Sequence, residues 1–95
     1  MDWFVLVARL KPHALEHARE LAAQVDPSAV ADFDRFGVFL SKGEVVFVFE
    51  GEHARETVRA HLNDPVESTA LSPWIPLFDG PLHAAREVYP ADAGA

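Results

Sequence analysis

Apolar residues run almost without a break through three short segments of the chain, where a sheet with one wet face would alternate apolar and polar positions. These segments are DWFVLVARL at 2–10, RFGVFLS at 35–41 and EVVFVFE at 44–50. The pattern predicts three strands, the last two joined by a hairpin turn at Lys42-Gly43 in which the glycine supplies a positive φ. A fourth strand, LHAAREVY at 82–89, follows SPWIPLFDGP, an irregular but apolar loop.

Two segments between these strands have helical spacing. The first, 12–25, begins at Pro12, which suits a first helical turn, and ends before Pro27. Its apolar stripe is Leu15, Ala18, Ala22 and Val25. The second, 52–63, carries a stripe of Ala54, Val58 and Leu62, with His61 at the edge of the same face. Both stripes recur at three and four residues, which is typical of an amphipathic helix packed on one side.

The order of these elements is strand, helix, strand, strand, helix, strand. It predicts an α+β chain of ferredoxin-like β-α-β-β-α-β type, with two helices on one face of a four-stranded antiparallel sheet in the order 4-1-3-2. The short turn fixes the hairpin register. On one face the expected pairs are Leu40–Val45, Val38–Phe47 and Phe36–Phe49. On the other they are Phe39–Val46, Gly37–Val48 and, as a cross-strand ion pair, Arg35–Glu50. Residues 1–90 form a single domain, and 91–95 are expected to be a disordered tail.

Two helices can cover only one face of such a sheet, although both faces are apolar. Each large apolar side chain left in water loses about 1.5–3 kcal/mol of burial. Six such losses would rival the whole stability of a small domain, roughly 5–15 kcal/mol. The sequence therefore predicts a homodimer in which a second copy of the chain covers the exposed sheet face around a two-fold axis.

Composition narrows the possible partners. The chain has a net charge of −7, and its 8 Lys and Arg residues are scattered, so neither a nucleic acid nor an anionic membrane is expected as a partner. It contains no cysteine, which excludes disulfides, thiolate nucleophiles and cysteine metal sites. Because Met1-Asp2-Trp3 carries an acid where a signal peptide would carry basic residues, and VLVARL is too short for a membrane span, the expected location is cytoplasmic.

The element order, the hairpin GVFLSKGEVVFVFEG and the closing segment PWIPLFDGPLHAAREVY together resemble the dimeric α+β barrel superfamily. Its members include antibiotic-biosynthesis monooxygenase-like proteins, stress-responsive barrel proteins, EthD-like proteins and SchA/CurD-like proteins. The resemblance covers residues 2–90 and brings no catalytic signature. It implies two sheets that face each other to form a barrel, with pockets inside the barrel or between sheet and helices. Several members act on aromatic or polyketide compounds without a metal or prosthetic group.

Three residues are candidate catalytic acids or bases, namely His61, His83 and Tyr89. Each is equally compatible with a purely structural role. His13 and His17 are expected on the first helix at i and i+4, with Glu20 one turn further on. That spacing could hold a metal, but no third ligand is placed by the sequence, so no native metal site and no cofactor are expected.

Five residues are candidate ligand contacts, and four of them are aromatic. They are Trp3, Phe36, Trp74, Phe78 and Arg86. The loop around Trp74 is either a lid that seals the core or the dimer seam, or one wall of a pocket for a flat apolar molecule, with Trp3, Phe36, Phe39 and Tyr89 completing the lining. Arg86 either pairs with a carboxylate across the dimer or binds an anionic or phenolate oxygen of a ligand.

Three functional hypotheses follow. The first is a small dimeric barrel that binds an apolar or aromatic molecule, as a cofactor-independent tailoring enzyme of monooxygenase or cyclase type. The second is a ligand-binding or stress-related barrel without catalysis. The third is a structural homodimer filled by its own side chains. Acid–base catalysis in the first would need only a pocket, one titratable group and an oriented substrate.

Overall fold

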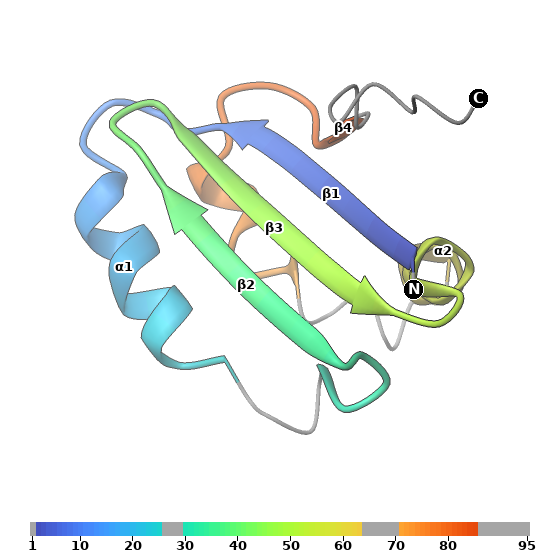
Figure 1. Cartoon of the computed structure of the whole chain (residues 1–95). Coiled ribbons are helices and arrows are strands. Elements are labelled where there is room, and N and C mark those ends of the chain that lie inside the picture. The colour runs from blue at the N-terminus through green and yellow to red at the C-terminus, as the bar shows by residue number, and fades with distance from the viewer. Residues whose placement is uncertain (1, 26–29, 64–70, 86–95) are drawn as a thin grey trace, which may run out of the picture.

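The computed structural model describes residues 2–25, 30–63 and 71–85, with the side chains of residues 61 and 63 left out. Its elements are β1 (Asp2–Arg9), α1 (Leu15–Ala23), β2 (Arg35–Leu40), β3 (Glu44–Gly51), α2 (Ala54–Asn63), the 3-10 helix η3 (Ile75–Leu77) and β4 (His83–Ala85) (Figure 1). The strands form one sheet in the order β2-β3-β1-β4, and each neighbouring pair is antiparallel. The predicted ferredoxin-like α+β fold class and strand order are confirmed.

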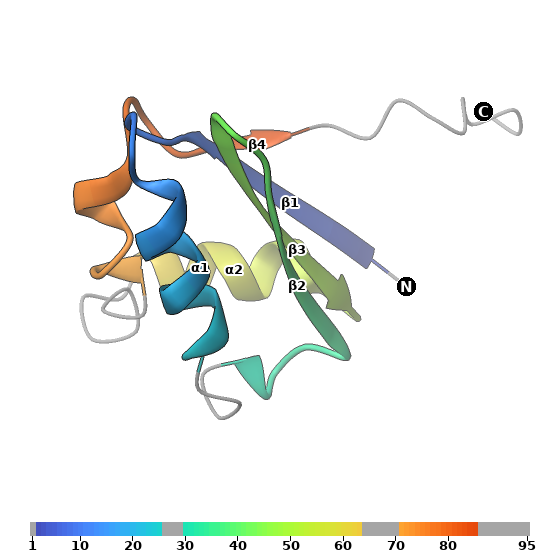
Figure 2. The same cartoon turned by 90° about the vertical axis from the view of Figure 1, so that its left-hand side faces the viewer.

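Both helices and the η3 segment lie on one side of the sheet, so the other side carries no element of the described chain (Figure 2). The helix α2 packs on β1 and β3, and α1 packs on β2. Two side chains of β3, Val45 at 0% and Phe47 at 2% exposure, are the most deeply buried of the larger residues. Around them lie apolar residues of β1, α1, α2 and η3, including Leu6, Ala18, Val58 and Leu77.

The loop after α2 supplies the largest aromatic side chain of this core. Trp74 is 4% exposed, and its ring meets the Phe47 ring edge-on, with 5.1 Å between centroids and 88° between planes. An edge-to-face contact of this kind stabilises beyond the area it buries. Of its neighbours, Leu77 is buried and Phe78 half-buried, whereas Ile75 is 60% exposed. The segment therefore closes the helix side of the sheet as a lid.

The hairpin has the predicted register in every pair, from Leu40–Val45 at the turn to Arg35–Glu50 at the far end. Two details differ. The N–H of Ser41 donates to the carbonyl of Glu44 at 3.0 Å, but Gly43 does not have the predicted positive φ. Arg35 and Glu50 are registered neighbours, yet their side chains do not form an ion pair within 4 Å in the described structure. Pairing of the backbone, not of these charges, holds the far end.

Both helices are shorter than predicted. The helix α1 begins at Leu15 because residues 12–13 form a turn, closed by the N–H of Ala14 donating to the carbonyl of Lys11 at 3.1 Å. His13 has a φ of 69° and so lies before the helix. The helix α2 begins at Ala54, where the Asp2 carboxylate accepts the N–H of Arg55 at 3.2 Å. A carboxylate at a helix N-terminus accepts a hydrogen bond from a free backbone N–H and interacts favourably with the positive end of the helix dipole.

The last strand pairs with β1 at His83–Ala85, shorter than the predicted 82–89. The remainder of the predicted strand and the predicted tail lie outside the described residues. Before β4, the N–H of Asp79 donates to the carbonyl of Arg9 at 2.7 Å, while His83 pairs with Val7. The four residue steps from Asp79 to His83 thus lie opposite only two steps in β1, from Arg9 to Val7. The extra residues form a bulge, and Gly80 accommodates it with a φ of 135°. Within the described ranges, no helix is both long and apolar enough to cross a bilayer.

The buried side of β3 is expected to dominate stability. Phe47→Ala should lower the free energy of unfolding by about 3–5 kcal/mol, because it removes a fully buried ring and the surface against which Trp74 packs. Ile75→Ala, at an exposed position of η3, should change it by less than about 0.5 kcal/mol. Urea titration followed by circular dichroism measures both. Similar losses for the two variants would contradict the one-sided core.

Candidate functional site

The face of the sheet turned away from the helices, which we call the open face, is built from alternate residues of all four strands. Strand residues alternate between faces, and Phe4, Leu6 and Ala8 of β1 are buried under the helices. The open face therefore consists of Trp3, Val5, Val7 and Arg9 of β1, Arg35, Gly37 and Phe39 of β2, Glu44, Val46, Val48 and Glu50 of β3, and His83 and Ala85 of β4.

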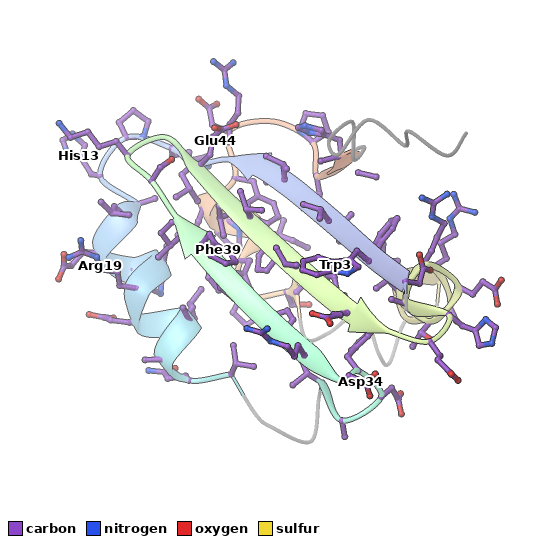
Figure 3. The ribbon with its side chains drawn as sticks, viewed as in Figure 1. Trp3, His13, Arg19, Asp34, Phe39 and Glu44 are labelled. Carbon is purple, nitrogen blue, oxygen red and sulfur yellow. The ribbon has the colours of Figure 1, made fainter. Side chains whose placement is uncertain are left out.

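The middle of the open face is apolar across the whole width of the sheet. The pairing places its residues in two rows, Phe39–Val46–Val7–His83 and Gly37–Val48–Val5–Ala85. The four valines are half-buried by their neighbours, so the loss of burial per valine is smaller than for a fully exposed side chain. The aromatic residues are more exposed, with Trp3 at 52% and Phe39 at 61%. Both lie on the side of the sheet turned to the viewer in Figure 3.

One row of the open face lies between the rows that carry these two aromatic residues. Gly37 carries no side chain, and a Cβ built there would lie 3.2 Å from Cε1 of Phe39, so the Phe39 ring leans over Gly37. Trp3 belongs to the next row on the other side. The row Gly37–Val48–Val5–Ala85 is thus flanked by one large ring on each side. Flat apolar surface between two aromatic rings favours a planar apolar ligand.

Charged residues lie at the two ends of the open face. Arg9 and Glu44 are opposite each other at the hairpin end, and the bulge places Asp79 on the other side of Arg9. Arg35 and Glu50 lie opposite each other at the far end. Within the described residues, neither pair is joined by an ion pair shorter than 4 Å. These four charges are therefore placed side by side without being neutralised in direct contact.

His83 is the one predicted catalytic residue whose side chain the described structure places. It lies on the open face in the row of Val7 and is exposed. Its Nδ1 atom lies 3.5 Å from the carbonyl oxygen of Pro81, too far for more than a weak hydrogen bond. The imidazole of His83 is therefore an exposed polar group beside an apolar surface.

The predicted aromatic lining does not come together on one surface. Trp3 lies on the open face, whereas Phe36, Trp74 and Phe78 lie on the helix side. Phe36 packs against Phe49 with ring centroids 5.1 Å apart, and Trp74 against Phe47 as described above. The expectation of one continuous lining is wrong because the sheet separates the two groups. Of the alternatives for the Trp74 loop, the lid agrees with its burial.

Three other predicted site residues lie wholly or partly outside the described residues. The backbone of His61 belongs to α2, but its side chain is outside the described structure, as are Arg86 and Tyr89 entirely. The prediction that His13 and His17 share a helix is wrong, since His13 lies in the turn before α1. Among the described residues, no three side chains of metal-binding type lie close enough together to hold an ion.

Sequence reasoning missed two features of the open face. The ring of Phe39 was considered only as part of a mixed lining, although its register opposite Val46 already assigned it to the uncovered face. The charged row of Arg9, Glu44 and Asp79 depends on the pairing of β1 with β3 and with the loop before β4. No turn joins those segments, so no local signal in the sequence fixes their register.

Comparison with known proteins shows the fold. No protein-family model matches the chain, and no curated protein matches it. A protein of Nitrosomonas europaea, named as a candidate antibiotic biosynthesis monooxygenase, superposes with a TM-score of 0.64 at 15% identity, over 93% of this chain and 90% of that one. A NIPSNAP family protein of unknown function from Agrobacterium tumefaciens gives 0.59 at 19% identity, over 93% and 90%. The protein Rv0793 of Mycobacterium tuberculosis gives 0.57 at 17% identity, over 88% and 91%.

These similarities define the class of protein. The chain has the ferredoxin-like α+β fold shared by an antibiotic biosynthesis monooxygenase-like protein and a NIPSNAP protein. The resemblance inferred from the sequence is thereby confirmed at the level of the fold. Identities between 15% and 19% carry the fold and not the activity.

Proposed function

We propose that the protein acts as a homodimeric barrel that binds an apolar or aromatic small molecule against the open face of its sheet. The observation that carries the proposal is the open face itself, an apolar surface of four strands that no described element of the same chain covers. Contiguous apolar surface of this kind marks a site of association or ligand binding.

A second copy of the chain is the partner that the surface favours. The open face is flat, and its apolar rows run from one sheet edge to the other, so two open faces can pack over their whole width. Sheets packed face to face lie about 10 Å apart and bury both inner surfaces. Burying Trp3 and Phe39 alone would recover roughly 1.5–3 kcal/mol for each ring in each copy.

Ligand binding is supported by the composition of the same surface. Between the rows of Trp3 and Phe39, Gly37 has no side chain and Ala85 has only a methyl group, and the Phe39 ring leans over Gly37. A planar apolar molecule bound there would contact aromatic rings and valines. The name of the Nitrosomonas europaea protein refers to antibiotic biosynthesis, and a related aromatic or polyketide ligand is our proposal for this chain.

A catalytic role, as a cofactor-independent tailoring enzyme, rests on His83. Its imidazole borders the apolar rows, where it could take or return a proton on a bound phenol or an activated C–H group. A binder without catalysis needs no such group. Loss of turnover with retained ligand binding in His83→Ala would separate these two roles.

Dimerisation through the open face predicts a specific disruption. Val48→Glu places a carboxylate in the centre of the face and should convert a micromolar dimer to a monomer, because a buried charge without a partner is strongly unfavourable. Ala60→Glu, at an exposed position of α2, introduces the same charge away from the face and should leave the dimer intact. Sedimentation velocity measures both masses. A wild-type monomer, or a dimer that survives Val48→Glu, would refute the proposed interface.

Binding against the row between Trp3 and Phe39 predicts which rings contribute to affinity. The dimer should bind 8-anilinonaphthalene-1-sulfonate. At protein concentrations at which sedimentation shows each variant to be dimeric, Trp3→Ala and Phe39→Ala should each weaken that binding by about fivefold, the equivalent of one aromatic contact. Ile75→Ala removes a side chain that is equally exposed but lies on η3, and should have no effect. Fluorescence titration gives the dissociation constants. A dimer that binds no probe, or binds it equally in all variants, would leave the structural homodimer as the better interpretation.

A further inference from the structure

The charged row at the hairpin end of the open face distinguishes between two possible orientations of the dimer, which the apolar rows do not. Two sheets packed face to face and related by a two-fold axis keep their strands roughly aligned. The axis must then run either along the strands or across them. The apolar rows are compatible with both orientations, since valines face valines in each. The charged ends differ between the two.

With the axis along the strands, β3 of one copy faces β1 of the other, and like ends meet. Because Arg9 and Glu44 occupy the same row, Arg9 then lies opposite the partner's Glu44, and the symmetry makes this contact twice. Asp79, on the outer side of that row, comes opposite the partner's hairpin turn, which contains Lys42. Every charge in the row meets a neutral or opposite charge.

With the axis across the strands, opposite ends meet and β3 faces β3. Glu44 would then lie opposite the partner's Glu50, again twice, whereas Arg9 would face Trp3 of the second copy and Arg35 would face its Ser41, so that no base lies directly opposite an acid. Like charges placed across an interface weaken association and select against that arrangement. Glu44 is exposed at the hairpin end of the sheet, where a side chain from a second copy can reach it (Figure 3).

We infer that Arg9 and Glu44 form two symmetric contacts between the copies and set the orientation of the dimer, with β2 of each copy beside β4 of the other. This inference rests on the proposed dimer and adds its geometry and the residues that select it. Within one copy, Arg9 and Glu44 are not in direct contact, so both remain free to pair with the second copy.

The test is a charge exchange divided between two proteins. Arg9→Glu alone and Glu44→Arg alone should each weaken the homodimer by about tenfold, because each turns two attractions into two repulsions. Mixing the two variants should restore association, since the carboxylate introduced at position 9 then faces the arginine introduced at position 44. Native mass spectrometry should show roughly nine in ten dimers as the mixed species, against half for random pairing.

Mixing also excludes the possibility that the variants associate weakly because of repulsion between positions 9 and 44 of the same copy. Each variant carries like charges at positions 9 and 44, so repulsion inside the protomer is present in both the homodimer and the mixed dimer. The matched control is Arg59→Glu mixed with Glu56→Arg, which makes the same charge changes on exposed residues of α2. This control pair should give random mixing. Circular dichroism verifies that each variant is folded.

Each result has a defined meaning. A wild-type chain that is monomeric would refute the proposed function itself. A wild-type dimer whose charge-exchanged variants mix at random would keep the dimer and overturn this inference. Tighter association of Glu44→Arg would identify the crossed orientation, in which position 44 faces Glu50. Should Arg9→Glu not fold, Arg9→Gln supplies the test, because it should abolish most of the salt dependence of the wild-type dissociation constant.

Discussion

The structure depends on a mismatch between a sheet that is apolar on both faces and helices that cover only one. Neighbouring residues of β3 show it most directly. Val45 and Phe47 are almost fully buried under the helices and Trp74, while Val46 and Val48, one step along the same strand, face outward. A strand that alternated valine with serine would pack on the same core and would leave a polar surface on the other face of the sheet. The outward valines and the two exposed rings give the second face of the sheet an apolar surface that the core of one chain does not require.

Much of the fold could be predicted because local signals determine it. The turn at Lys42-Gly43 pairs Ser41 with Glu44, and every pair of the hairpin follows from that single contact. Helix boundaries were less predictable, because a proline at position 12 is as suitable for a turn as for a first helical turn. The chain uses it in the turn, and α1 begins at Leu15. The left-handed His13 that completes the turn has no counterpart in any residue pattern.

The candidate site could be predicted only in part, since a residue's type does not state the side of the sheet on which it lies. In a strand, alternation settles that question, and it places Trp3 and Phe39 on the open face. In the loop 72–81 there is no period, and Trp74 resembled a pocket residue until its contact with Phe47 placed it in the core. The charged row requires the register of β1 against β3, a pairing of residues far apart in the chain.

An apolar sheet face alone gives little specificity for one orientation of its partner. Valine packs as well against valine in one orientation as in another, so a face made only of such rows would join copies in several ways and risk open-ended association. Charges placed at the ends of the rows cost little stability, because they stay near solvent, yet they distinguish orientations by the sign of each contact. In the proposed dimer, the apolar middle of the open face would supply the affinity and its charged ends would set the orientation of the two copies. Within one copy, Arg9 and Glu44 are not joined by an ion pair shorter than 4 Å, so the proposed dimer would leave both charges available for contacts between copies.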